Sequence, residues 1–255
     1  MKHDTSYVNV KYAPLDFDIS SAVVYPNFIT VDEGRYLINE CAKRLKRRRF
    51  EDGHWDSVIT GYREVELSTP NEHELNQDMH EDVPQFAKTI HKTRKHLAEN
   101  HFNKSNNNHI QWLPCHAIDL STKGVLKAHV DSVKFSGEIV AGISLLSDAI
   151  MRLRPSSDEW DSGGTKDDTK DDTNSDANTN EEYVDLYLPQ NSLYVLSGIS
   201  RYSYTHELLP TGSKFELSVS GSEEDDTIIE VIRGRRLSII FRDATKGKNN
   251  FVMHI

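Results

Sequence analysis

The chain has few cysteines, no long apolar run and no basic leader, and each absence narrows its class. Among 255 residues the only cysteines are Cys41 and Cys115, without a C-x-x-C spacing, which is typical of a reducing compartment and argues against a disulfide framework. No run of about eighteen apolar residues is present, so no membrane span is predicted. The first twenty-five residues contain no arginine and three aspartates, a composition that fits neither a secretory signal nor a mitochondrial presequence. From these features alone we expect a soluble protein of the cytoplasm or nucleus.

The formal net charge of -10 is concentrated in one segment. Residues 156–182 hold ten acidic side chains against two lysines, so the rest of the chain carries only about -2. The same segment consists largely of Ser, Thr, Asn, Asp and Gly, which bury too little apolar surface to repay the cost of ordering. We therefore predict a disordered acidic insertion at 156–182, a second polar loop at 211–226, and tails at 1–21 and 246–255.

Between the tails, residues 22–245 are predicted to form a single domain of α+β class that is mainly β. Its first part, 30–110, reads as helical, because Thr30 and Glu33 have the spacing of a capping box and are followed by apolar residues at helical spacing. Residues 71–101 are predicted to form a pair of helices with a break at Pro84. Its second part, 111–243, is predicted to be an antiparallel β-sandwich. The expected strands are Trp112–Leu120, Val125–Ser132, Ile139–Leu146, Ile150–Leu153, Val184–Leu188, Leu193–Leu196 and Leu237–Phe241.

A basic run, Lys43 to Arg49, ends the first predicted helix. Such a cluster can contact phosphate. The alternative interpretation is a solvated helix C-terminus, where cations are favoured by the helix dipole.

The stretch Gly124–Ser132 alternates apolar and polar residues, which predicts a strand on which His129 and Asp131 project from the same face. One imidazole and one carboxylate are two-thirds of the two-His-one-carboxylate arrangement that holds non-haem Fe(II) with coordination positions left open. His-x-Asp also occurs at 54–56 and 80–82. The 80–82 copy lies in a predicted helix, where residues two apart diverge. The 54–56 copy lies before the helices predicted for 71–101, so no antiparallel partner strands follow it closely to carry a third ligand.

Two later features extend the motif. His206 follows the predicted strand Leu193–Leu196 and a turn, so a jelly roll can return it beside His129. Farther on, Arg236, Ser238 and Arg242 share one face of a strand whose opposite face is apolar. Two guanidiniums on a buried strand need anions, which a dicarboxylate cosubstrate bound to the metal would provide. The alternative is an internal ion pair with Asp or Glu.

His129-x-Asp131, His206 and Arg236-x5-Arg242 resemble the signature of the AlkB family of 2-oxoglutarate- and Fe(II)-dependent dioxygenases. Further stretches, Arg47–Glu64, Ala141–Ser147 and Arg233–Ser238, are most similar to its mitochondrial, seventh-homologue branch. The resemblance implies a double-stranded β-helix (jelly roll) with flanking N-terminal helices. It also implies that Fe(II) is held by His129, Asp131 and His206. The cosubstrate 2-oxoglutarate would be held by Tyr194, Arg236, Ser238 and Arg242, and O2 would be the oxidant.

The resemblance further implies hydroxylation or demethylation of a protein or a methylated RNA, with a regulatory role in mitochondrial programmed necrosis and fatty-acid metabolism. It places the protein in the mitochondrial matrix. Apart from the resemblance, we expect a monomer. Two departures from the family matter. Ile118 and Leu120 stand where the bacterial founder has polar cosubstrate contacts, and residues 66–110 read as helix and loop where a nucleotide-recognition lid would have hairpins. Repair of duplex DNA is therefore not expected. The alternative function is a β-helix that binds metal or a partner with little or no turnover.

Overall fold

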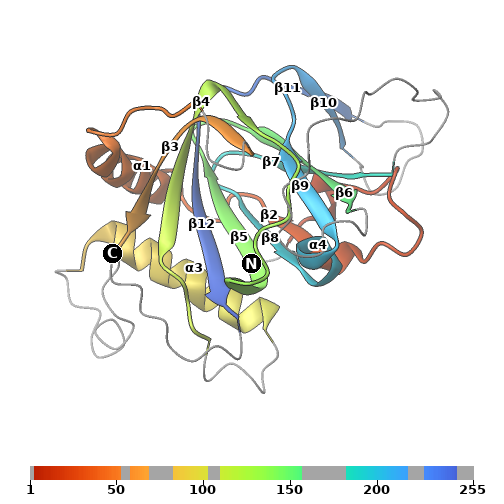
Figure 1. Cartoon of the computed structure of the whole chain (residues 1–255), viewed down its shortest axis with the longest axis horizontal. Helices are drawn as coiled ribbons and strands as arrows, with labels where there is room; N and C mark the ends of the chain where they lie inside the picture. The colour runs from red at the N-terminus through yellow and green to blue at the C-terminus, as the bar shows by residue number, and fades with distance from the viewer. Residues whose placement is uncertain are drawn as a thin grey trace.

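Two antiparallel sheets form the body of the molecule. The structure is a computed structural model and describes residues 3–52, 58–68, 83–102, 110–156, 182–217 and 227–245. The six strands of the larger sheet are, in spatial order, β2 (Ala22–Tyr25), β8 (Leu193–Ser197), β5 (Ser136–Leu145), β12 (Arg236–Ala244), β4 (Cys115–Leu126) and β3 (Ile59–Leu67). The four strands of the smaller sheet are β1 (Val8–Asn9), β7 (Val184–Leu188), β6 (Ala149–Pro155) and β9 (Tyr204–Leu208). A hairpin of β10 (Ser213–Leu217) and β11 (Thr227–Val231) lies beyond them (Figure 1).

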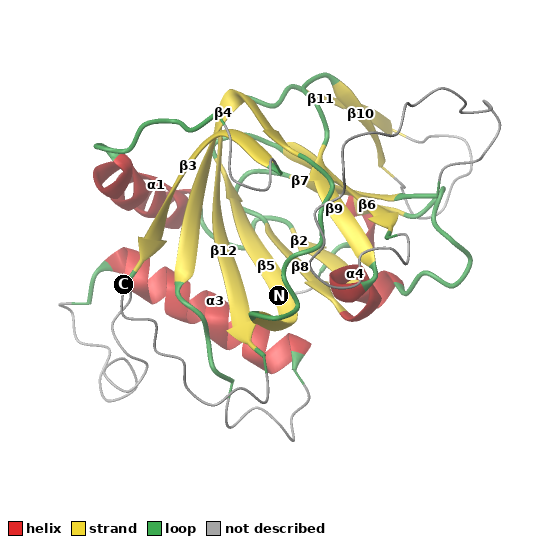
Figure 2. Ribbon diagram, viewed as in Figure 1, coloured by secondary structure: helices red, strands yellow, loops and turns green. Residues whose placement is uncertain are grey.

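In the part of the chain that the structure describes, the two long helices lie on one face of the larger sheet. α1 (Val31–Leu45) and α3 (Gln85–His101) lie along that face, whereas α4 (Gly198–Tyr202) is a short turn between β8 and β9 (Figure 2). Two 3₁₀ turns, η1 (Thr5–Tyr7) and η2 (Ile19–Ser21), precede β2. The predicted capping box is confirmed, because the Thr30 hydroxyl accepts from Glu33 N and the Glu33 carboxylate accepts from Thr30 N. No helix in the described ranges is long and apolar enough to cross a bilayer.

The larger sheet separates two hydrophobic cores. Between the sheet and the helices lies a helix-side core, to which β12 contributes Leu237, Ile239 and Phe241. Between the two sheets lies an inter-sheet core that includes Met151 and Leu208. Because side chains alternate along a strand, the other residues of β12 face the space between the sheets, as the sequence predicted. That space is where the site is built.

One predicted strand is wrong. β4 runs without a break through Lys123 and Gly124, which had the appearance of a turn, and ends at Leu126. It continues because Gly61, at φ +63°, and Gly124 pass within close contact of each other, where a Cβ on Gly61 would lie 2.9 Å from the Gly124 Cα. After Leu126 the chain leaves the larger sheet and crosses to the smaller one, so His129 lies in an isolated bridge to β9 and not in a strand from 125 to 132.

The described parts of two predicted irregular segments are also more regular than expected. The 1–21 tail contributes β1, in which Val8 is buried opposite Leu186 of β7. The polar loop predicted for 211–226 begins with β10, whose Phe215 is 1% exposed. The acidic insertion beyond residue 156, the C-terminal tail and the part of the predicted helical pair that precedes Pro84 lie outside the described residues, apart from their edges.

Candidate metal and cosubstrate site

A backbone bridge between the sheets brings two histidines together. His129 N donates to His206 O at 3.2 Å, and His206 N donates to His129 O at 2.8 Å. The two imidazole centroids are 4.2 Å apart. His206 lies in the middle of β9 and is 7% exposed, so it is fixed by a sheet and does not hang from a turn.

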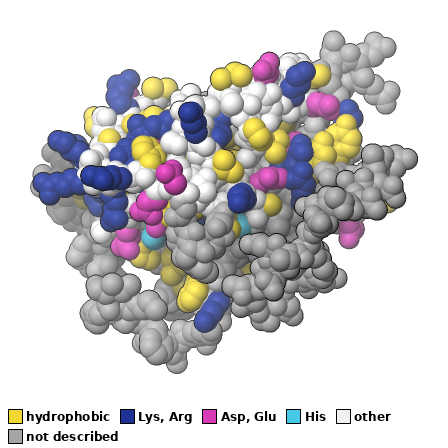
Figure 3. Space-filling view, turned by 45° about the horizontal axis from the view of Figure 1, so that its top comes forward, with side chains coloured by type: hydrophobic (Ala, Val, Ile, Leu, Met, Phe, Trp, Pro, Cys, Tyr) yellow, Lys and Arg dark blue, Asp and Glu magenta, His cyan; other side chains and the backbone are white. Residues whose placement is uncertain are grey.

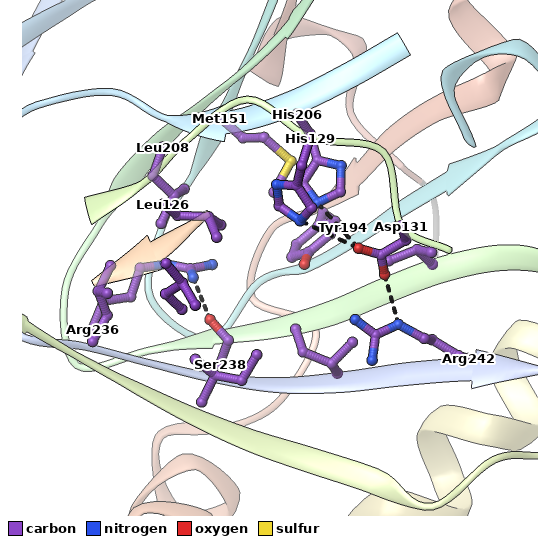
Figure 4. A pocket seen from close by; sticks show the side chains of 15 residues that line it. Leu126, His129, Asp131, Met151, Tyr194, His206, Leu208, Arg236, Ser238 and Arg242 are labelled. Carbon is purple, nitrogen blue, oxygen red and sulfur yellow. Dashed lines mark hydrogen bonds and ion pairs between the residues drawn. The ribbon is translucent and has the colours of Figure 1, made fainter. Parts of the chain in front are cut away.

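The carboxylate of Asp131 completes the cluster. Its Oδ1 lies 3.3 Å from His129 Nε2 and 3.8 Å from His206 Nε2. Its Oδ2 accepts a hydrogen bond of 2.6 Å from Arg242 Nε. One ligand atom from each of the three residues lies within 4.8 Å of the others, and their side chains point toward one another in Figure 4.

The hydrogen bonds of these groups aim the ring nitrogens at the carboxylate. His129 Nδ1 lies 2.8 Å from the Lys127 carbonyl, which can only accept, so Nδ1 donates to that carbonyl and Nε2 is the nitrogen that faces Asp131. Burial, reinforced by the neighbouring His129, lowers the pKa of His206 to about 3, which keeps that ring neutral. His129 Nε2 and Asp131 Oδ1, 3.3 Å apart, can share either a proton or a metal ion, so a bound cation would take the place of the hydrogen bond between them.

Asp131 is held in its charged form. Burial by itself raises the pKa of this carboxyl, but the hydrogen bond with His129 and the positive charge of Arg242 outweigh burial and bring the pKa well below its usual range. The site therefore offers two imidazole nitrogens and one anionic oxygen as ligands, the set that suits Fe(II).

A buried cation lies across the cavity from this cluster. Arg236 is 5% exposed and bonds to the Ser238 hydroxyl through Nη1, while its Nε and Nη2 are buried without a hydrogen-bond partner. Burial lowers its pKa to about 10. The Tyr194 hydroxyl lies at the same cavity, and burial raises the pKa of that phenol. Tyr194 lies over Gly142 of the neighbouring strand, where a Cβ would come within 2.5 Å of the ring.

The sequence left two interpretations of Arg236 and Arg242, an internal ion pair or a bound dicarboxylate, and the structure differs between the two arginines. Arg242 does pair with a carboxylate, that of Asp131. For Arg236, no ion pair occurs among the residues that the structure describes, and two of its nitrogens are left to meet an anion. An internal salt bridge therefore explains only one of the two guanidiniums.

All seven predicted site residues line one cavity of about 60 Å³: His129, Asp131, Tyr194, His206, Arg236, Ser238 and Arg242. Ile118 and Leu120 line it as well, so the β4 wall of the cavity is apolar. The competing His-x-Asp copies at 54–56 and 80–82 lie outside the described residues. Sequence reasoning missed the remaining apolar wall, formed by Ile59, Leu126, Val140, Met151, Leu208 and Ile240. Only Ile240 carried a signal, because it falls between Ser238 and Arg242 in the strand alternation.

Comparison with known proteins agrees with this chemistry. Residues 21–242 match the family described as 2OG-Fe(II) oxygenase superfamily. The chain belongs to this superfamily. It is 32% identical over 226 residues to the mouse (Mus musculus) protein named alpha-ketoglutarate-dependent dioxygenase alkB homolog 7, mitochondrial, covering 89% of this chain and 80% of that protein. The protein of the same name from cattle (Bos taurus) is 31% identical over 227 residues, with the same coverage.

Solved structures show the superfamily fold. A prolyl hydroxylase from Trichoplax adhaerens, in complex with a peptide fragment of the hypoxia inducible factor oxygen degradation domain, superposes with a TM-score of 0.53 at 10% identity. The match covers 89% of this chain and 84% of that one. The two facing antiparallel sheets are therefore the double-stranded β-helix that the sequence predicted.

Membership in the superfamily makes this chain a dioxygenase of AlkB-homolog-7 type that uses Fe(II), 2-oxoglutarate and O2. The residues present fit these groups. Three converging donors of the right types suit the metal, and buried guanidinium nitrogens without a partner suit an organic anion beside it.

Proposed function

We propose that His129, Asp131 and His206 hold the iron of this dioxygenase and that Tyr194, Arg236, Ser238 and Arg242 hold 2-oxoglutarate. The observation that carries the proposal is the pair of buried, unpartnered nitrogens of Arg236 in the cavity that also holds the His-Asp-His cluster. Arg236 and Ser238 would bind the distal carboxylate, with the Tyr194 hydroxyl. When bound together, iron and cosubstrate supply the oxidation of a substrate C–H bond, coupled to conversion of 2-oxoglutarate and O2 to succinate and CO2.

Arg242 has a distinct role in this proposal. Its Nε holds Asp131 Oδ2 at 2.6 Å, which leaves Oδ1 as the oxygen that faces both imidazoles. Asp131 is thus oriented so that it would give the metal a single oxygen, and three protein ligands would leave room for the cosubstrate and O2. Arg242 would also lie near the carboxylate of 2-oxoglutarate that chelates the metal.

A spectroscopic and product assay tests the proposal. Under argon, Fe(II) and 2-oxoglutarate added to the protein are expected to give a visible absorption band from the metal–cosubstrate complex. Admission of O2 is expected to give succinate. Both signals should disappear in His129→Ala. If the wild-type protein gives neither, the alternative of a metal- or partner-binding module without turnover stands in its place.

For the substrate, two classes each have an observation in their favour. A protein side chain is supported by the fold likeness to a prolyl hydroxylase that was solved with a peptide. A methylated RNA is supported by the exposed basic run at the end of α1, where Lys43 is 75% exposed and residues 46–49 are exposed. Lys and Arg side chains gather on the α1 side of the molecule in Figure 3. Alanine replacement of residues 46–49 separates the two, because an RNA enzyme should lose salt-sensitive RNA binding.

We extend the proposal to a regulatory enzyme of the mitochondrial matrix, acting in programmed necrosis and fatty-acid metabolism. The mitochondrial part is supported by the names of the mouse and cattle relatives, and the physiological part by the resemblance to their branch. Mass spectrometry of RNA and protein modifications in cells with the wild-type enzyme or with His129→Ala would identify the substrate. Fractionation of the same cells would test the location.

A further inference from the structure

A second buried arginine, which the sequence did not single out, reaches the segment that follows the metal-binding motif. Arg201 lies in the last turn of α4 and is 2% exposed. Its Nη1 donates to the carbonyl of Asp131 at 2.9 Å. Its Nη2 donates to the Ser136 hydroxyl at 2.7 Å and carbonyl at 3.2 Å, with a longer contact of 3.4 Å to the Ser132 carbonyl.

These acceptors are all neutral, so the hydrogen bonds of Arg201 fix the loop without a carboxylate to offset the cost of burying the charge. A buried guanidinium is normally paired with a carboxylate because desolvating its charge is costly. Burial indeed lowers the pKa of Arg201. A cost of this kind is retained where the arrangement it maintains is needed, and the arrangement here is the backbone of Asp131.

The helix that carries Arg201 is directly connected to the strand that carries the ligand His206. Arg201 lies five residues before His206, and only a single residue separates the end of α4 from β9. The neighbouring Ser200 hydroxyl lies 2.5 Å from that of Ser21, which fixes α4 against η2. Arg201 therefore links α4, which leads directly into the strand that carries His206, to the loop that carries Asp131.

A second clamp holds the far end of the same loop. Asp243 is 3% exposed, and its two carboxylate oxygens accept from the backbone N–H groups of Glu138 and Ile139 at 3.0 Å. Arg201 holds carbonyls between residues 131 and 136, and Asp243 holds the N–H groups where β5 begins. The 131–139 segment is thus fixed at both ends, and the only ligand that lies within it is Asp131.

We propose that Arg201 is a positioning residue of the metal site, which sets the backbone of Asp131 so that its carboxylate meets the two imidazoles. The inference rests on the proposed function, because it takes His129, Asp131 and His206 as the metal ligands. Arg242 fixes the carboxylate end of Asp131, and Arg201 fixes the main-chain end. Losing either is expected to loosen the ligand without removing it.

Metal affinity in the absence of turnover tests the proposal. Co²⁺ binding under argon would be followed by its visible absorption and by calorimetry in wild type, Arg201→Ala and Arg201→Lys. Arg201→Ala should bind Co²⁺ about 10- to 100-fold more weakly, the range seen when groups that orient metal ligands are removed. Arg201→Lys should lose less, because a lysine keeps the charge but lacks the fork. Guanidinium chloride, far below denaturing concentration, should restore much of the affinity of Arg201→Ala.

A matched control separates positioning from general stability. Arg94, on α3, is another buried arginine, and its guanidinium donates to the carbonyl of Leu113. Arg94→Ala removes that guanidinium. It should lower the free energy of unfolding yet keep Co²⁺ affinity and absorption unchanged. Equal loss of affinity in the Arg94 and Arg201 variants, or no loss in Arg201→Ala, would overturn the proposal.

Should Arg201→Ala fail to fold, Ser136→Ala is the milder test, because it removes one acceptor of Arg201 together with the hydrogen bond that the Ser136 hydroxyl donates to the Ser132 carbonyl of the same loop. A weakening of about 2- to 5-fold supports positioning, and wild-type affinity refutes it. Failure of the proposed function gives a different pattern. In that case the wild-type protein binds no Co²⁺, or His129→Ala binds it as tightly as wild type.

Discussion

Replacing Arg236 with methionine should make the protein more stable while removing its response to 2-oxoglutarate. The reason is that Arg236 is 5% exposed and carries two buried nitrogens without a hydrogen-bond partner. Without its anion, the folded protein therefore has to keep an uncompensated charge in a cavity with largely apolar walls. Methionine has a similar length and no charge, so it can fill the space.

The size of the effect follows from the pKa of the group. Burial lowers the pKa of Arg236 from 12.5 to about 10, which corresponds to a cost of about 3 kcal/mol for keeping the charge in the fold. The substitution also gives up the hydrogen bond to Ser238, worth about 1 kcal/mol. Arg236→Met is thus expected to raise the free energy of unfolding by about 1 to 3 kcal/mol, within the range found when buried charges are replaced by apolar side chains.

The gain in stability on adding 2-oxoglutarate should be larger for the wild-type protein than for Arg236→Met. With 2-oxoglutarate at about 100 times its dissociation constant, the wild-type protein should gain about 2.7 kcal/mol. The measurement is urea unfolding under argon with Mn²⁺, with and without 2-oxoglutarate, for both proteins. Arg236→Met should unfold at higher urea than wild type in the absence of cosubstrate and gain almost nothing when it is added.

Two results would refute this reasoning. If Arg236→Met were less stable than wild type without cosubstrate, the buried guanidinium would be a stabilising group and not a cost. If the variant kept the full gain on adding 2-oxoglutarate, the anion would bind elsewhere. Arg94→Met is the control, because its guanidinium is bonded to a carbonyl and its removal should destabilise.

Three further predictions concern the walls of the site, the core and pH. Gly142→Ala places a Cβ 2.5 Å from the Tyr194 ring. It should lower the free energy of unfolding by about 1 to 3 kcal/mol, measured by urea unfolding, and weaken 2-oxoglutarate binding several-fold, measured by calorimetry. Unchanged affinity would mean that Tyr194 does not contact the cosubstrate. Phe241→Ala empties a fully buried position of the helix-side core and should lower the free energy of unfolding by about 3 to 5 kcal/mol, and a loss below about 1 kcal/mol would contradict that packing. Burial, with the charges of neighbouring histidines, lowers the pKa of His101 to about 4. The same imidazole in the unfolded chain takes up a proton near pH 6.5. The contribution of neutral His101 to the free energy of unfolding should therefore be fully present above pH 6.5 and be lost between pH 6.5 and 4. In urea unfolding, wild type should lose about 2 kcal/mol more than His101→Gln between pH 7 and 4.5, and equal losses would show that His101 is not the group that titrates.

Local chemistry in the sequence determined several features of this protein without help from the fold. The capping box at Thr30 and Glu33 involves neighbours in the chain, and the structure forms it. The alternation along 236–242 places the polar and the apolar side chains on opposite faces of a strand, independently of what packs against each face. β12 shows this arrangement. The types of the donors in His129, Asp131 and His206 likewise indicated non-haem iron before their positions were known, and they meet at one point.

Tertiary structure alone decided how those donors meet. The sequence placed His129 on a continuing strand, but the close approach of Gly61 and Gly124 extends β4 and sends the chain across to the smaller sheet. There the bridge to His206 and the hydrogen bonds from Arg201 fix the ligands through backbone groups. Backbone carbonyls and N–H groups are the same in every residue, so contacts made through them leave no pattern in a sequence. The register of two distant segments has to be known before such contacts can be seen.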